Sequence, residues 1–126
     1  MSKQGLNLGR RGEELAVELL KKNGYQIIAR NHKSSLGEID IIAKDKDTLC
    51  FIEVKTRRSD KFGSGLEAVS HFKQRQISKV ALEFLKEKNL LESRARFDVV
   101  AVSCKDAEPK LELCKDAFEL NQGYTY

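Results

Sequence analysis

The chain has 126 residues, of which 40% are hydrophobic and 33% are charged, with a formal net charge of +4 at pH 7 and a pI near 9.0. This composition predicts one soluble domain, residues 1–126, with a core at about 9–104 and a peripheral tail at 115–126. The sequence lacks both an apolar stretch of the roughly 18 residues that a membrane span needs and an apolar secretory signal, so we expect a cytoplasmic protein without a membrane partner.

Residues 10 to 23 are predicted to form the first helix, which Gly24 can close with a left-handed cap. Its apolar arc comprises Leu15, Ala16, Leu19 and Leu20. Glu13 lies at the edge of this arc, from where its side chain can lean over the following sheet. The alternative for Glu13 is a first-turn acid that the helix dipole favours.

A first strand is predicted at residues 25 to 31, followed by a short polar connection at residues 32 to 36. His32 falls in that connection, where a lone histidine is more often exposed to solvent than catalytic. We therefore assign no role to His32.

Residues 37 to 56 carry two apolar runs rich in Ile, Val and Phe, which predict an antiparallel hairpin. With the turn centred on Lys46 and Asp47, the register pairs Asp40 with Glu53 across the ladder. A slip of one residue would send one partner to the opposite face, so this pairing depends on the register.

Side chains alternate between the two faces of a strand, so the same register gives the hairpin one apolar face. That face comprises Ile39, Ile41, Ala43, Cys50, Ile52 and Val54. The other face carries Ile42 and Phe51 at one end, and at the other end Glu38, Asp40, Glu53 and Lys55.

Asp40 and Glu53 are two like charges at directly opposed positions, an arrangement that destabilises a sheet by up to about 1 kcal/mol. A divalent cation held by both carboxylates would offset this repulsion. Oxygen ligands suit the hard ions Mg²⁺ and Mn²⁺, and Lys55 would point into the same site. The hairpin therefore predicts a magnesium or manganese site.

The residues after the hairpin suggest contacts with phosphate. Residues 57 to 65 combine basic residues, an aromatic residue and glycines, as in a mobile loop at a phosphate-binding mouth, and a plain solvated loop explains them nearly as well. Residues 66 to 88 have helical spacing, and Lys73 falls on the apolar stripe. Its ammonium group either extends to water or points into the active-site cleft, where Gln74 could assist.

The C-terminal third predicts two more strands. A near-continuous apolar run at residues 99 to 102 is typical of a buried central strand, and Asp98 at its start is expected to pair with a neighbouring arginine rather than to act in catalysis. Leu111 and Leu113 suggest a short edge strand, and residues 121 to 126 a frayed tail. The three cysteines are expected to be buried free thiols.

Asp40 followed by Glu53-Val54-Lys55 resembles the PD-(D/E)xK nuclease signature, without a proline before the aspartate. The wider pattern at residues 9–19 (GRRGEELAVEL), 37–42 (GEIDII), 51–57 (FIEVKTR) and 97–100 (FDVV) resembles the YraN family of predicted endonucleases. This resemblance spans residues 5 to about 104. It implies an α/β, restriction-endonuclease-like core: an N-terminal helix, a mixed central sheet around the hairpin and one long helix after it.

The resemblance also implies a function, because the family is distantly similar to archaeal Holliday junction resolvases. We expect a metal-dependent DNA endonuclease that could act on branched or structured DNA, and by analogy a homodimer. Asp40, Glu53, the Val54 main-chain carbonyl and Glu13 would hold Mg²⁺ or Mn²⁺, and Lys55 would stabilise developing charge. The residues expected to contact nucleic acid are Arg10, Arg11, Arg57, Arg58, Lys61, Lys73 and Gln74.

Two other readings stay open. The fold could serve as a non-catalytic module that binds nucleic acid or a protein, although Asp40, Glu53 and Lys55 are all retained. A purely structural domain with a Glu38–Lys55 ion pair would account for Lys55 but not for the opposed acids.

Overall fold

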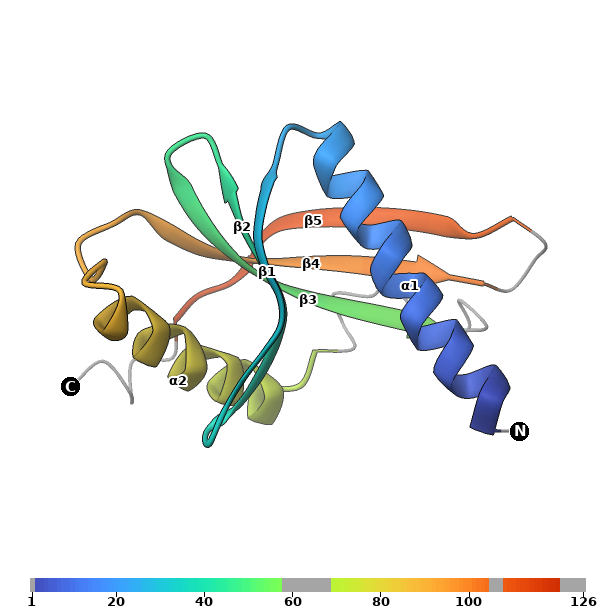
Figure 1. Ribbon diagram of the computed structural model, residues 1–126, viewed down its shortest axis with the longest axis horizontal. Helices are drawn as coiled ribbons and strands as arrows, with labels where there is room; N and C mark the ends of the chain where they lie inside the picture. Colours follow the sequence, from blue (N-terminus) through green and yellow to red (C-terminus); the bar gives the residue numbers. More distant parts are fainter. Residues whose placement is uncertain (1, 58–68, 105–107, 121–126) are drawn as a thin grey trace.

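The computed structural model describes residues 2–57, 69–104 and 108–120 (Figure 1). Two helices and five strands follow one another in the order α1 (Ser2–Lys22), β1 (Gln26–Ser34), β2 (Gly37–Asp45), β3 (Thr48–Arg57), α2 (His71–Glu87), β4 (Ala95–Ser103) and β5 (Lys110–Phe118). The strands form one sheet in the order β1-β2-β3-β4-β5, in which only β3 and β4 are parallel. The expected mixed α/β architecture is confirmed. No helix in the described ranges is long and apolar enough to cross a membrane.

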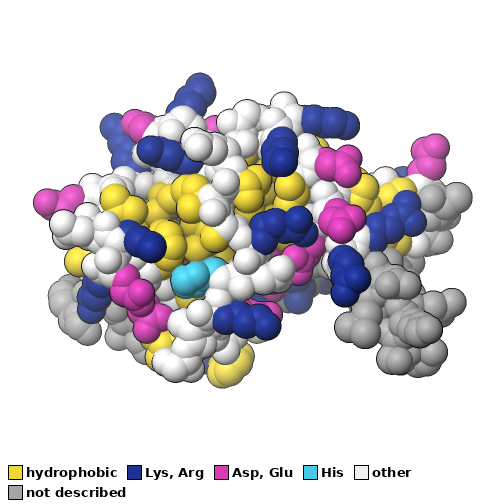
Figure 2. Space-filling model, in the orientation of Figure 1, with side chains coloured by type: hydrophobic (Ala, Val, Ile, Leu, Met, Phe, Trp, Pro, Cys, Tyr) yellow, Lys and Arg dark blue, Asp and Glu magenta, His cyan; other side chains and the backbone are white. Residues whose placement is uncertain are grey.

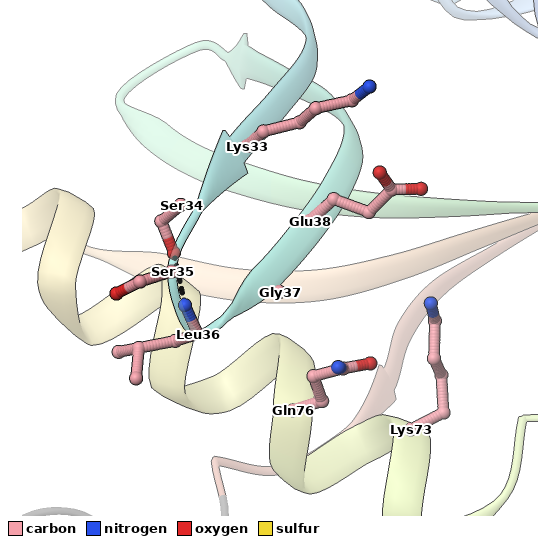
Figure 3. A pocket seen from close by; sticks show the side chains of 8 residues that line it. All are labelled: Lys33, Ser34, Ser35, Leu36, Gly37, Glu38, Lys73 and Gln76. Carbon is pink, nitrogen blue, oxygen red and sulfur yellow. Dashed lines mark hydrogen bonds between the residues drawn. The ribbon is translucent and has the colours of Figure 1, made fainter.

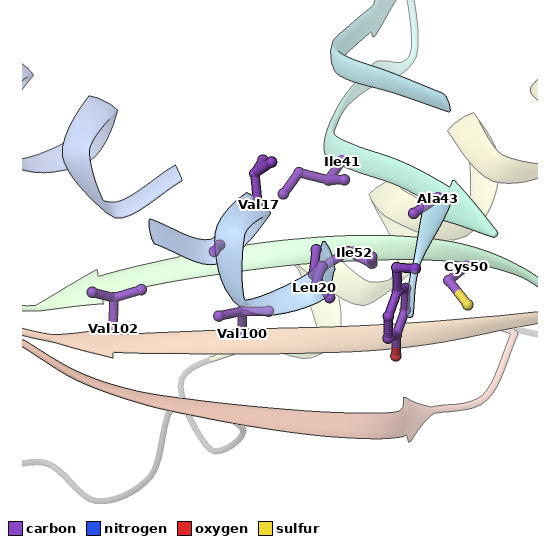
Figure 4. Close-up of a cluster of buried hydrophobic side chains, with 10 residues drawn as sticks. Val17, Leu20, Ile41, Ala43, Cys50, Ile52, Val100 and Val102 are labelled. Atoms are coloured by element: carbon purple, nitrogen blue, oxygen red, sulfur yellow. The ribbon is translucent and has the colours of Figure 1, made fainter. Parts of the chain in front are cut away.

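The two helices pack on opposite faces of the sheet, because adjacent strand residues belong to different hydrophobic clusters. Ile52 and Ile41 lie in a cluster with Ala16 and Leu20 of α1 (Figure 4). Phe51 instead lies in a second cluster, which contains the apolar residues of α2. This alternation follows from the period of two along a strand, and it gives β3 a helix on each side.

The ends of both helices are fixed by local hydrogen bonds. Gly24 has φ 88° and its N–H donates to the Lys21 carbonyl, which confirms the predicted left-handed cap after α1. The hydroxyl of Ser70 accepts the N–H of Lys73 and caps α2. The helix was predicted to begin at residue 66, but residues 69 and 70 precede it and it begins at His71. Residues 66–68 lie outside the described chain.

The β2–β3 hairpin has the predicted turn, in which Lys46 has φ 58°. Its ladder runs from Asp45 and Thr48 to Ile41 and Ile52, in the predicted register. Ile39 was predicted on the same apolar face as Ile41, but it is buried in the α2 cluster, whereas Ile41 lies in the α1 cluster. The alternation breaks where β2 leaves β3: the ladder to β3 ends at Ile41, while β2 stays paired with β1 through Ile39.

β1 and β5 are longer than the sequence predicted. β1 continues to Ser34, so His32 is not in a loop; its ring packs edge-on against Phe84, with 5.3 Å between centroids. β5 continues to Phe118, whose ring stacks on Phe97 at 4.7 Å, so residues 115 to 118 belong to the sheet edge rather than to a separate tail. The predicted frayed tail at residues 121–126 lies outside the described residues.

A buried ionic network joins β4 to its neighbours. Asp98 is fully buried, and its carboxylate accepts hydrogen bonds from Arg96 at 2.9 Å and from the Tyr25 hydroxyl at 2.8 Å. Arg96 also donates to Asp45 at 2.7 Å. These bonds raise the pKa of Arg96 although burial acts to lower it. The predicted structural salt bridge of Asp98 is confirmed.

The three cysteines are free, as expected. Cys50 is buried, and burial raises the pKa of its thiol to about 12. Cys104 and Cys114 are only partly buried, contrary to expectation, because they lie near the sheet's outer strand.

Candidate active site

The candidate site forms where β2 separates from β3. In these described strands the ladder does not include the predicted pairs of Asp40 with Glu53 and of Glu38 with Lys55. Instead, Oδ2 of Asp40 accepts the main-chain N–H of Val54 at 2.8 Å. A side-chain carboxylate thus occupies the place that a β2 carbonyl would take in a continued ladder. This bond holds the Asp40 carboxylate against β3.

Glu53 is the buried acid of the site, with 6% of its surface exposed. Burial raises its pKa to about 8, and the negative charge of Asp40 adds to this rise, while Lys73 and Lys55 oppose it. Nζ of Lys73 lies 4.0 Å from Oε2 of Glu53. The predicted proximity of the two carboxylates is therefore present, through side-chain contact rather than through strand pairing.

Glu13 approaches this pair from α1. Its pKa is raised by burial and then by the charge of Asp40, whereas a hydrogen bond from Asn31 and the charge of Arg30 act to lower it. Arg30 lies 3.9 Å from Glu13. Glu13 therefore leans toward the sheet, as the sequence suggested. It is not a first-turn acid, because α1 begins at Ser2 rather than at the predicted residue 10.

The position of α1 depends on a close contact next to Glu13. A Cβ atom at Gly12 would lie 2.1 Å from Oγ1 of Thr56 on β3, which is closer than any real contact. Only glycine lets the helix approach the strand at this point. Gly12 thereby sets the distance between Glu13 and the carboxylates.

Among the described residues expected to assist, Lys73 forms a salt bridge with the acid Glu53. The Gln74 amide donates to the Val69 carbonyl at 3.0 Å, so Gln74 is committed to the start of α2. Lys55 is half-buried on β3 and acts electrostatically on Glu53. Sequence reasoning missed Asn31, whose φ of 52° is a conformation that asparagine tolerates; nothing in its sequence context marks it.

The remaining basic residues are spread over the structure. Arg10 and Arg11 are exposed on α1, and Arg57 is half-buried at the end of β3, where its Nη1 has no hydrogen-bond partner within the described chain. Arg58 and Lys61, with the predicted loop, lie outside the described residues. Figure 2 shows lysine and arginine side chains interspersed with acidic ones, so on this face the positive charge is not gathered in one patch.

The donor atoms fit a magnesium-type ion held by two carboxylates. Asp40 and Glu53 offer hard oxygen ligands, and Oδ1 of Asp40 is not used by the Val54 bond. No group of three or more His, Cys, Asp or Glu side chains close enough to hold a metal occurs among the described residues. Magnesium is commonly bound by only one or two carboxylates together with water and substrate phosphate, so a pair is a sufficient donor set.

The family model and the similar proteins point to the same family. The sequence model of the uncharacterised protein family UPF0102 matches residues 12–102. A UPF0102 protein of Syntrophus aciditrophicus is 51% identical over 120 residues, covering 95% of this chain and 94% of the relative. UPF0102 proteins of Geotalea uraniireducens and Caldicellulosiruptor saccharolyticus are 52% and 49% identical, over 90% and 88% of this chain and 91% and 96% of the relatives.

Proposed function

We propose that this chain, which belongs to the uncharacterised protein family UPF0102, is a metal-dependent endonuclease that hydrolyses phosphodiester bonds in DNA. The membership covers the whole candidate site, because Glu13, Asp40, Glu53 and Lys55 all fall within residues 12–102. The nuclease activity is inferred from the chemistry of that site.

One observation carries the proposal: two carboxylates lie close together in a partly buried place, where a bound cation would compensate both charges. Asp40 is fixed by the Val54 N–H, and Glu53 is buried beside it with its pKa raised to about 8. A purely structural role would favour either a neutral residue or a close ion pair at Glu53. Lys73, at 4.0 Å, is only a loose counter-charge.

In the proposed mechanism Asp40 and Glu53, with the Val54 carbonyl, would hold Mg²⁺ or Mn²⁺, and Glu13 would lie beside this donor set rather than within it. The bound ion would polarise the scissile phosphate and lower the pKa of a water molecule. Glu53 would have to give up its proton to serve as a ligand, because only the carboxylate binds a cation. The Val54 N–H holds Asp40 in place, and Arg30 lies 3.9 Å from Glu13.

The two lysines would act on the substrate rather than on the metal. Lys55 lies on the same strand as Glu53, two residues further on, and its ammonium group would stabilise the charge that develops on the phosphate oxygens. Lys73 pairs with Glu53 in the free protein. With Glu53 engaged as a metal ligand, Lys73 would be free to contact a phosphate of the DNA.

The test is cleavage of labelled linear, flapped, single-stranded and four-way-junction DNA in Mg²⁺, Mn²⁺ or EDTA. Glu53→Ala removes the buried ligand, and the matched control Glu87→Ala removes an exposed acid at the end of α2. We expect metal-dependent cleavage by the native chain and by Glu87→Ala, and none by Glu53→Ala. Binding without cleavage in every metal would instead favour a non-catalytic DNA-binding module.

A further inference from the structure

A pocket of about 460 Å³ opens beside the candidate active site, between the β1–β2 turn and the first turns of α2 (Figure 3). Its polar lining comes from Lys33, Ser34, Ser35, Glu38, Lys73 and Gln76. Lys73 is also the residue that lies 4.0 Å from Glu53. The pocket and the carboxylate pair therefore share one wall.

The lysines of this pocket are available to an anion. Figure 3 shows Lys33 of β1, Glu38 of β2 and Lys73 of α2 projecting to the same side of the turn. Lys33 and Glu38 are paired in the β1–β2 ladder, yet neither lysine forms a salt bridge with Glu38 in the described part of the chain. With two ammonium groups and one carboxylate, these residues carry a net charge of +1.

The turn itself is held in a shape that supplies further donors. The Ser34 hydroxyl accepts the N–H of Leu36 at 3.0 Å, which leaves its O–H free to donate. Gly37 has φ 146°, and a Cβ atom there would lie 2.7 Å from Cγ of Gln76. The glycine thus lets the chain approach the Gln76 side chain of α2, which lines the pocket.

We propose that this pocket binds a backbone phosphate of the nucleic acid next to the one that is cleaved. Lys33 and Lys73 supply the charge, and Ser34 and Gln76 supply hydrogen-bond donors to the phosphate oxygens. Lys73 joins this subsite to the carboxylates, so substrate binding would draw Lys73 away from Glu53. The inference rests on the proposed nuclease function and extends it, because it assigns Lys33 and Gln76 a role in positioning the substrate.

The pocket also contains the acid Glu38, so substitutions can either lower or raise its net positive charge. Lys33→Ala removes a favourable charge and should weaken DNA binding by about 3- to 10-fold. The slope of log affinity against log salt concentration should become shallower by about one phosphate contact's share. Glu38→Gln removes an unfavourable charge and should tighten binding. The matched controls are Lys44→Ala, an exposed lysine at the other end of β2, and Glu87→Gln on α2.

Binding is measured by fluorescence anisotropy of a labelled flapped duplex in EDTA, over a range of salt concentrations. A set of the same duplexes, each with one neutral methylphosphonate linkage, then locates the contact. We expect one linkage near the cut position to weaken native binding, and to weaken binding by Lys33→Ala less, since one of the contacts to that phosphate is already lost.

The outcomes separate the two proposals. If the native chain binds and cuts DNA but Lys33→Ala behaves as Lys44→Ala does, or no single linkage depends on Lys33, the phosphate subsite is wrong and the nuclease proposal stands. If the native chain neither binds nor cuts any of the DNA probes with Mn²⁺, both are wrong.

Discussion

Nζ of Lys73 lies 4.0 Å from Oε2 of Glu53, and this loose ion pair is the link between α2 and the β2–β3 hairpin at the candidate site. The distance is too long for a strong hydrogen-bonded pair, which would lie below about 3 Å. The lysine therefore tempers the charge of Glu53 without neutralising it, and the pKa of Glu53 stays raised at about 8.

The stability of the metal-free protein should fall with rising pH. Between its ordinary value of 4.5 and the raised value of about 8, Glu53 keeps a proton in the folded state that the unfolded chain has released. Folding is then favoured at the low end of this window and loses that contribution as the pH rises through about 8. Glu53→Gln mimics the protonated acid, so it should remove this slope and exceed native stability above pH 8 by more than about 1 kcal/mol.

Urea unfolding in EDTA at several pH values measures this difference, with Glu87→Gln as the control for loss of an exposed acid. A Glu53→Gln protein that is less stable than the native chain at high pH would show that the carboxylate is a structural anchor instead.

Mn²⁺ should stabilise the native fold through Asp40 and Glu53. A ligand present at 100 times its dissociation constant adds about 2.7 kcal/mol to the free energy of unfolding. The gain should increase as the pH rises toward 8, because binding displaces the Glu53 proton. Asp40→Asn should abolish the gain and still fold, since the amide oxygen can accept the Val54 N–H.

Differential scanning fluorimetry with and without Mn²⁺ provides the measurement, and Asp47→Asn, an exposed acid in the hairpin turn, provides the control. An equal shift in melting temperature for Asp40→Asn and the native chain would place the metal elsewhere.

The approach of α1 to the sheet should depend on Gly12. Gly12→Ala places Cβ 2.1 Å from Oγ1 of Thr56, and we expect a loss of about 1–3 kcal/mol in stability. Gly9→Ala is the matched control on the same helix, because nothing lies within 4 Å of its added methyl group. Helix propensity alone should make Gly9→Ala more stable by about 0.5–1 kcal/mol.

Chemical denaturation of the two single variants and of Gly12→Ala/Thr56→Ala completes this test. The double variant should recover most of the loss, because the clashing hydroxyl is gone. No recovery would mean that the cost arises within the helix.

The network around Asp98 should be the main ionic contribution to the fold. Asp98→Asn leaves Arg96 without its buried partner and should cost about 3–5 kcal/mol, as breaking a buried ion pair does. Asp47→Asn breaks an exposed pair with Arg94 and should cost less than about 1 kcal/mol. Thermal unfolding of both variants measures the two losses of stability. Similar losses would contradict the view that the Asp98 network is the main ionic contribution.

Local patterns in the sequence predicted much of this fold correctly. The apolar arc at Ala16 and Leu20, the cap at Gly24 and the turn at Lys46 each depend on neighbouring residues only. Ile39 was placed on the wrong face because the point where β2 leaves β3 is a tertiary property, which the local pattern of one strand does not show.

In the candidate site, too, some contacts could be predicted from the sequence and others could not. The closeness of Asp40 and Glu53 could be predicted from the hairpin register, although the ladder ends before this pair and the acids meet through their side chains. The commitment of Gln74 to the Val69 carbonyl could not be predicted, because the start of α2 depends on the Ser70 cap. His32 likewise has no sequence signal for its contact with Phe84, which joins two elements far apart in the chain.

The parallel pairing of β3 with β4 has a consequence for the order of folding. It pairs Glu53 with Val99, and this contact closes a far longer loop than the turn of the β2–β3 hairpin does. If the hairpin forms first, Asp40 and Glu53 meet before Lys73 arrives with α2, and their repulsion opposes the early step. Refolding in a stopped-flow instrument should then be faster at a pH below 4.5, or for Glu53→Gln, than at neutral pH. A pH-independent refolding rate would show that the acids come together only after the rate-limiting barrier.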